Sequence, residues 1–239
     1  MELTKENRVL IQVLLFIGAY MIIRTVIYLF IPATSQWAWF YRDCWMTIPR
    51  FVTFCSLLVI DRYIWKSSLF DFLLKDIGRA AFYGGILIFI YLFHLIGSYG
   101  DPWPRKFILI AIFTSAIVGL FEEYAFRGVI LGHLVKKWSK IIAILGSSAI
   151  FTLFHFQAQP LTEWPGIFLA GVALANLRLK GLSLFWLVII HTIIDAAYFF
   201  FGTSMPRFFS IHKLIFLAAM ILYGIITYPR DIQEKSVKI

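Results

Sequence analysis

Long apolar runs recur along the whole chain and are separated by short polar links. Most of these runs approach the roughly 20 residues that a helix needs to cross the hydrocarbon core of a bilayer. The pattern predicts eight helical spans, at residues 9–30, 44–60, 80–97, 107–135, 141–156, 164–177, 182–201 and 211–228. We therefore predict an all-α, polytopic membrane protein in which residues 1–239 form a single integral domain.

The composition agrees with a membrane protein, since 61% of the residues are hydrophobic and only 15% are charged. A net charge of +9 would suggest a nucleic-acid partner in a soluble protein. Here most Lys and Arg residues lie in the short links between spans, so we expect no nucleic-acid partner. Most of these cations lie in links on the same side of the membrane as the N-terminus. The number of spans is even, so the C-terminus lies on that side too. The chain is therefore predicted to be integral to the membrane with both termini in the cytoplasm.

Ionisable side chains interrupt three of the predicted spans. Each such group costs about 2.5–3.5 kcal/mol at the centre of a membrane helix and normally faces a bundle interior or water. They are Glu122, Glu123 and Arg127 in the fourth span, His155 in the fifth, and His191 and Asp195 in the seventh. Groups of this kind are functional candidates by default.

Helical geometry predicts that four of these groups can meet. With a rise of 1.5 Å per residue from the predicted cytoplasmic ends, Glu122 lies about 20 Å deep, His155 about 22 Å, His191 about 14 Å and Asp195 about 20 Å. His191 and Asp195 are four residues apart, so one helix face presents both.

The three charges of the fourth span have different expected roles. Glu123 and Arg127 are four residues apart and can pair on one face, whereas Glu122 is rotated from them by about 100°. We therefore assign Glu123 and Arg127 to support and Glu122 to chemistry. Taken singly, a buried Glu–Arg pair or an intramembrane histidine also fits a structural role. Four polar groups at similar depth are more than packing requires.

The remaining ionisable groups within or near the spans are expected to have ordinary roles. We expect Arg24 and Arg50 to reach the membrane interface or to pair with another side chain. His94, His133 and His212 stand near span ends without polar partners at helical spacing, so an interfacial position is predicted for them.

Three short motifs resemble the CPBP, or Abi, family of intramembrane proteases, which includes the type II CAAX prenyl endopeptidases. EEYAFR matches EExxxR, FTLFH matches FxxxH with Phe151 and His155, and HTIID matches HxxxN/D. The glycine-bearing run of residues 166–191 is also similar to that family's stretch before its last histidine. The resemblance covers residues 107–201, which we take as the catalytic core.

The resemblance implies an intramembrane endopeptidase with a catalytic cavity inside the helical bundle. In that family the first glutamate of EExxxR and the histidine of FxxxH are thought to activate a water. Carried over to this chain, Glu122 is the general base, His155 its partner on the water, and His191 with Asp195 supports the oxyanion or completes the site. The substrate implied is a membrane-associated peptide or lipidated protein, whether a prenylated CAAX-type protein or a precursor peptide.

One residue departs from the prenyl endopeptidases, which have Asn where this chain has Asp195. An ionised Asp cannot donate a hydrogen bond to an oxyanion, so Asp195 instead has the chemistry to orient His191. The set of Glu122, His155, His191 and Asp195 also suits a zinc ion, which would then activate the water. Because the chain has no HExxH helix, we favour glutamate chemistry without a cofactor.

Two other functions use the same polar groups. A transporter could relay protons or bind a cation with them, and a non-catalytic relative could bind and regulate a membrane partner. The sequence lacks the internal repeats expected of a transporter. It also retains every group of the three motifs, which favours the enzyme.

Overall fold

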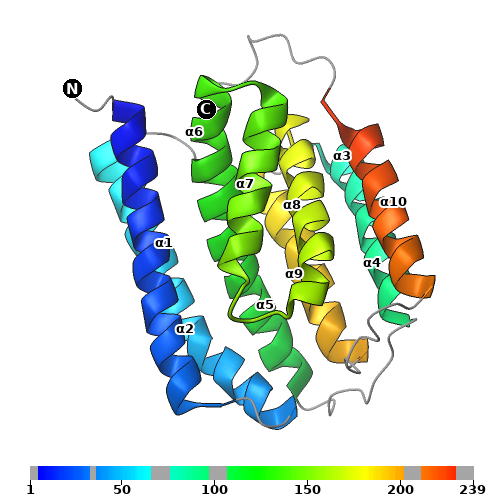
Figure 1. The fold of residues 1–239 in the computed structure, drawn as a ribbon, viewed down its shortest axis with the longest axis horizontal. Helices are drawn as coiled ribbons and strands as arrows, with labels where there is room; N and C mark the ends of the chain where they lie inside the picture. Colours follow the sequence, from blue (N-terminus) through cyan, green and yellow to red (C-terminus); the bar gives the residue numbers. More distant parts are fainter. Residues whose placement is uncertain (1–4, 33–35, 66–75, 97–106, 202–210, 230–239) are drawn as a thin grey trace.

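The computed structural model describes residues 5–32, 36–65, 76–96, 107–201 and 211–229 and is drawn in Figure 1. The described residues contain helices and no strand. The elements are α1 (Lys5–Phe30), α2 (Gln36–Ile60), η1 (Asp61–Trp65), α3 (Ile77–Arg79), η2 (Ala80–Gly84), α4 (Gly85–Ile96), α5 (Ile108–Glu122), η4 (Glu123–Ile130), α6 (Leu131–Lys137), α7 (Lys140–Phe154), η5 (Leu161–Glu163), α8 (Trp164–Leu179), α9 (Leu184–Phe201) and α10 (Ile211–Thr227).

These helices fall on the eight predicted spans, which confirms an all-α, polytopic membrane protein. Five helical stretches of the described chain are long and apolar enough to cross a membrane. They are Asn7–Phe30, Tyr41–Ile64, Ile77–Ile96, Ile108–Lys137 and Leu184–Phe201. Helices α7 and α10 are shorter apolar helices.

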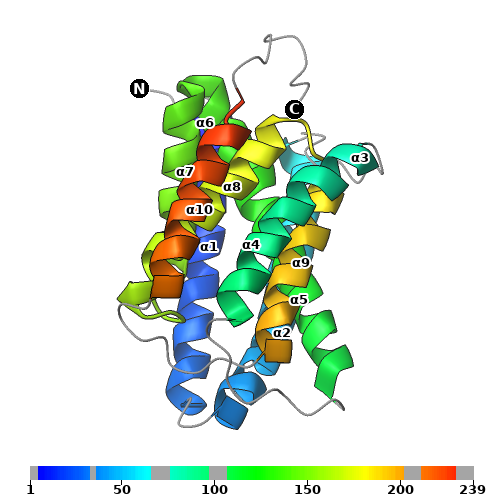
Figure 2. The same ribbon diagram turned by 90° about the vertical axis from the view of Figure 1, so that its right-hand side faces the viewer.

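The long helices form two layers. In Figure 1, α1, α7, α8 and α10 lie in front of α2, α5, α9 and α4, and Figure 2 shows the layers from the side. Contacts join α5 to α9 and α7 to α8 most extensively. The continuous helix formed by α5, η4 and α6 runs obliquely between the layers, so the segment that carries EExxxR passes through the middle of the molecule.

Two glycines allow helices to approach closely around the centre. A Cβ on Gly119 of α5 would lie 3.2 Å from both the Val188 carbonyl oxygen and the Thr192 hydroxyl of α9. A Cβ on Gly171 of α8 would lie 2.9 Å from the Cβ of Ser148 in α7. Small residues are the usual means by which membrane helices come together, and here they bring α5 against α9 and α8 against α7.

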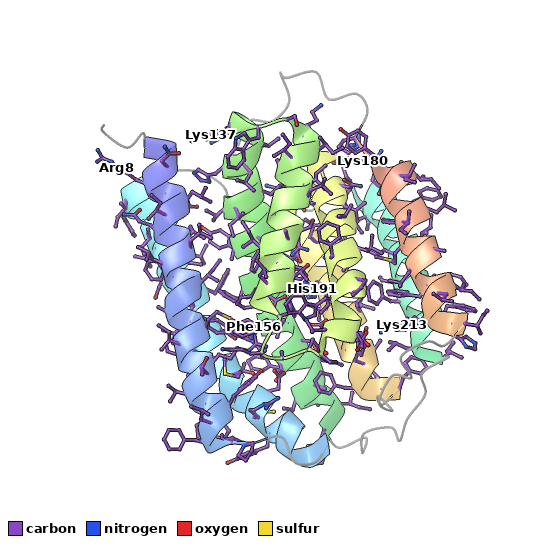
Figure 3. All side chains as sticks on the ribbon, viewed as in Figure 1. Arg8, Lys137, Phe156, Lys180, His191 and Lys213 are labelled. Carbon is purple, nitrogen blue, oxygen red and sulfur yellow. The ribbon has the colours of Figure 1, made fainter. Side chains whose placement is uncertain are left out.

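Cationic side chains mark the two ends of the bundle. In Figure 3, Arg8, Lys137 and Lys180 lie at one end, and Lys213 lies toward the other. Lys137 also donates a hydrogen bond to the side chain of Asn7, which ties α6 to α1 at the first of these ends. This grouping agrees with the charge pattern of the links, and the cytoplasmic location of that end stays a prediction.

Candidate active site

Glu122, the last residue of α5, lies in the centre of the bundle and is 3% exposed. Its Oε2 atom is 3.8 Å from Nε2 of His155 and 3.7 Å from Nε2 of His191. No described residue hydrogen-bonds with this oxygen. A buried carboxylate oxygen thus faces two imidazole nitrogens at distances longer than a direct hydrogen bond.

Glu123 holds the opposite nitrogen of the His191 ring. Its Oε1 accepts a hydrogen bond of 2.7 Å from Nδ1 of His191 and also lies 3.1 Å from Nη1 of Arg127. The predicted pairing of Glu123 with Arg127 is therefore present, and neither side chain is more than 2% exposed. Sequence spacing did not reveal that Glu123 also orients His191, because this contact joins η4 to α9, far apart along the chain.

The two adjacent glutamates lie where the helix changes its hydrogen-bonding pattern. Residues Glu123–Ile130 form a π-helix, with hydrogen bonds from residue i to residue i+5, between the α-helices α5 and α6. Such widened turns are rare and occur frequently at functional sites. Here Glu122 and Glu123 approach opposite nitrogens of one ring rather than diverging to separate partners.

Phe151 connects the EExxxR and FxxxH motifs. Its ring lies 4.1 Å from the guanidinium carbon of Arg127 and 4.6 Å from the ring centre of His155. Its carbonyl oxygen accepts a hydrogen bond of 2.8 Å from Nδ1 of His155. Because a carbonyl only accepts, Nδ1 carries the proton, and Nε2 of His155 presents a lone pair toward Glu122.

His155 lies just beyond the end of α7, where the prediction had placed it inside a span. The chain turns at this residue, and its side chain keeps 18% of its surface exposed. The helix ends here in a turn whose amides donate to the carbonyls of the last helical residues, as the His155 amide donates to the Thr152 carbonyl. The histidine is thereby held at a helix end that is open on one side.

Asp195 reaches the same group of side chains from α9. Its Oδ2 lies 3.5 Å from Nε2 of His191, four residues earlier, and its side chain is 30% exposed. Since Glu123 already occupies Nδ1, Asp195 does not hold the nitrogen that fixes the orientation of the ring. It stands instead on the side of the ring that faces Glu122.

Metal-binding geometry is absent from the described part of the chain. No three His, Cys, Asp or Glu side chains there converge as ligands of one ion. The Nδ1 atoms of His155 and His191 bond to a carbonyl and a carboxylate, and their Nε2 atoms face Glu122. Chemistry without a cofactor stays a prediction.

Expectations about the other polar residues are confirmed only in part. Arg24 and Arg50 are both buried and do not reach the membrane interface, but Arg50 pairs with Asp43 at 2.8 Å, which is the second of its two expected roles. His94 and His133 are buried as well: His94 stacks on Phe216, with ring centres 4.2 Å apart, and Nδ1 of His133 bonds to the Val129 carbonyl. His94 packs against α10 and Arg50 donates a hydrogen bond to Tyr20 of α1, and spacing along one helix does not reveal such contacts between helices. His212 is exposed, as expected.

One comparison with known proteins found a family model that matches the centre of the chain. Residues 104–197 match the family model described as type II CAAX prenyl endopeptidase Rce1-like. Comparison with curated proteins found no match, and comparison with solved structures found none either. The matched segment contains all three motifs and every residue of the cluster around Glu122. Residues 104–197 are thus similar to the type II CAAX prenyl endopeptidases, the resemblance that the motifs predicted.

Proposed function

We propose that the protein is an intramembrane endopeptidase that hydrolyses a peptide bond of a membrane-associated substrate. The observation that carries this proposal is the convergence of Glu122 Oε2 on the Nε2 atoms of His155 and His191, at 3.8 and 3.7 Å. Polar atoms at this separation are suited to hold a small hydrogen-bonding group between them. The match to CAAX prenyl endopeptidases supports the same chemistry.

Glu122 and His155 are the groups proposed to activate water. Both present acceptors, since Oε2 of Glu122 is unpartnered among the described residues and Nε2 of His155 has its lone pair free. A water that donates one hydrogen to each acceptor directs an oxygen lone pair at the substrate carbonyl. As the C–O bond forms, Glu122 takes the water proton as general base.

His191 is the proposed donor to the oxyanion. Glu123 holds its Nδ1–H, so the ring presents Nε2 to the reacting atoms. An imidazolium with Asp195 and Glu122 near Nε2 can donate from this nitrogen to the negative oxygen. Asp195 then acts through His191 by compensating the charge of the imidazolium. It does not have to donate a hydrogen bond to the oxyanion, which an ionised carboxylate cannot do.

The second half of the reaction returns the proton. When the tetrahedral intermediate collapses and the C–N bond breaks, protonated Glu122 donates to the leaving amine. The carboxylate is thereby regenerated, and the products are a new carboxyl terminus and a new amino terminus. No metal or other cofactor takes part in this sequence.

The substrate is proposed to be a peptide that is itself held at the membrane, prenylated or otherwise hydrophobic. The chain spans a membrane, and its catalytic candidates lie in the middle of the bundle (Figure 3, His191). With both termini in the cytoplasm, such a substrate enters from the bilayer or from the cytoplasmic surface.

Purified protein tests this proposal against a panel of quenched peptides, prenylated and unprenylated, with products identified by mass spectrometry. Wild type is expected to cleave at least one peptide, Glu122→Gln is expected to cleave none measurably, and a chelator is expected to leave the rate unchanged. The matched control is the double substitution Glu163→Gln with Lys213→Gln, which removes both charges of an ion pair outside the cluster. Equal cleavage by wild type and Glu122→Gln would exclude the role of Glu122, and loss of activity with chelator would require a metal.

A further inference from the structure

Among the described residues three arginines are buried in the bundle, and one of them differs from the other two. Arg127 pairs with Glu123 and Arg50 pairs with Asp43, at 3.1 and 2.8 Å. Arg24 of α1 is 2% exposed, yet no described carboxylate forms an ion pair with it. An isolated buried charge is strongly unfavourable, so a buried guanidinium without a carboxylate requires a separate explanation.

The contacts of Arg24 fix its position but give it no carboxylate in direct contact among the described residues. Its Nη1 donates a hydrogen bond of 3.0 Å to the carbonyl oxygen of Phe154, and its guanidinium lies 5.1 and 5.5 Å from the ring centres of Tyr28 and Phe154. Its Nε atom is buried without a hydrogen-bond partner among the described residues. With Nη1 engaged, the edge formed by Nε and Nη2 is the one that matches the two oxygens of a carboxylate.

Arg24 borders the catalytic cluster. The residue whose carbonyl it holds, Phe154, directly precedes His155. Tyr20, one turn before Arg24 in α1, packs against Phe154 and against Phe121, the residue before Glu122, with ring centres 5.5 and 5.0 Å apart. Arg24 also lies within electrostatic range of both Glu122 and His155. An anion bound at Arg24 would therefore sit close to the reacting bond.

We propose that Arg24 binds a carboxylate of the peptide substrate, which compensates the buried charge when the substrate is in place. This proposal rests on the proposed peptidase function and adds a specificity residue from a helix outside the matched family segment. The carboxylate has two sources, the C-terminal α-carboxylate of the substrate or an Asp or Glu side chain near the scissile bond. A lipid phosphate fits less well, because Arg24 is buried among α1, α7 and their aromatic side chains.

The test compares three forms of one hydrophobic peptide that the wild type cleaves: a free C-terminal acid without Asp or Glu, its C-terminal amide, and the amide with one Glu placed beyond the scissile bond. We expect at least one carboxylate-bearing form to exceed the neutral amide in kcat/KM by roughly 10-fold or more, the effect of a hydrogen bond to a charged group. In Arg24→Gln this ratio should fall to about one, and Arg24→Lys should restore part of it. Preference for the acid identifies the α-carboxylate, and preference for the Glu peptide identifies a side chain.

Matched controls separate recognition from folding. Arg8→Gln removes the same charge from the exposed end of the same helix and should keep the wild-type ratio. Thermal unfolding of each variant checks that Arg24→Gln, whose amide can still donate to the Phe154 carbonyl, retains the fold. Equal kcat/KM for all three peptides in wild type, or an unchanged ratio in Arg24→Gln, would overturn the proposal.

Binding distinguishes this proposal from the peptidase function itself. Fluorescence anisotropy in the Glu122→Gln background measures the affinity for labelled versions of the same peptides without turnover. Tighter binding of a carboxylate form that depends on Arg24, without any cleavage by wild type, would retain the carboxylate site and reject the peptidase. Cleavage without any preference for a carboxylate would retain the peptidase and reject the carboxylate site. No binding of any form would also reject the carboxylate site.

Discussion

Buried charges are arranged differently in the centre of the molecule and in the helices around it. In the centre, partners are shared: Glu123 contacts both Arg127 and His191, and His191 lies near Glu122 and Asp195 as well. In the outer helices the carboxylates pair singly, as Asp43 does with Arg50 and Glu163 with Lys213.

The difference separates a site that can move protons from contacts that hold helices together. In each outer pair, one carboxylate is matched by one cation. In the central network, Glu122 Oε2 remains unpartnered among the described residues, although it is buried beside two histidines. An unsatisfied buried carboxylate costs stability and is retained where chemistry requires it.

The largest effect is expected for Glu122→Gln, which keeps the shape of the side chain and removes the base. We expect kcat/KM to fall by about 10²–10⁴-fold, the scale of general-base catalysis, with little change in unfolding temperature. Peptide cleavage and thermal unfolding in detergent measure the two effects. A large loss of stability with normal activity would show that Glu122 belongs with the structural pairs.

Glu123→Gln should damage both stability and activity, because this carboxylate serves two partners. Removing it leaves the guanidinium of Arg127 buried without a counter-charge, which costs about 3–5 kcal/mol of unfolding free energy. His191 also loses its acceptor at Nδ1 and with it the fixed orientation of its ring. Chemical unfolding measures the cost. A loss of unfolding free energy as small as that for an outer ion pair would mean that serving two partners does not make Glu123 more important for stability.

The helices and the members of the central cluster could be predicted because apolar spans are easily recognised and ionisable residues stand out within them. Glu122, His155, His191 and Asp195 were placed at similar depth by rise per residue alone, and the structure brings them together. The extent of the catalytic core at residues 107–201 stays a prediction, and so do the catalytic roles.

Contacts between helices could not be predicted. Sequence spacing shows which residues share one face of a helix, but it does not show which other helix packs against that face. The hydrogen bond from His191 to Glu123 and the one from Arg24 to Phe154 both join distant segments. The π-helix of Glu123–Ile130 has no signature in residue type, since its hydrogen-bonding pattern depends on how the surrounding helices pack. For that reason the joint role of the two glutamates on one imidazole became visible only in three dimensions.

Phe151→Leu should have an intermediate effect. Leucine keeps an apolar side chain and the backbone carbonyl that holds His155, but it loses the aromatic face against Arg127. A desolvated cation–π contact contributes about 2 kcal/mol, so we expect a comparable loss of unfolding free energy and a fall in activity. Phe185→Leu, a change in α9 outside the cluster, is the control. Equal effects of the two substitutions would mean that the ring of Phe151 only fills space.

The smallest effect is expected when an outer pair is removed as a whole. Lys213 and Glu163 form an ion pair of 2.6 Å that ties α10 to η5, with side chains 9% and 22% exposed. Replacing both, as Glu163→Gln with Lys213→Gln, removes the two charges of this pair together, so the free energy of unfolding should change by about 1 kcal/mol or less. Because this pair shares no atom with the central network, kcat/KM should stay within about twofold of wild type. A twofold change is a small fraction of the roughly 1.4 kcal/mol in activation free energy that a tenfold change requires. A loss of activity as large as that of Glu122→Gln would remove the distinction between shared and isolated charges, since it would make the outer pair part of the reacting system.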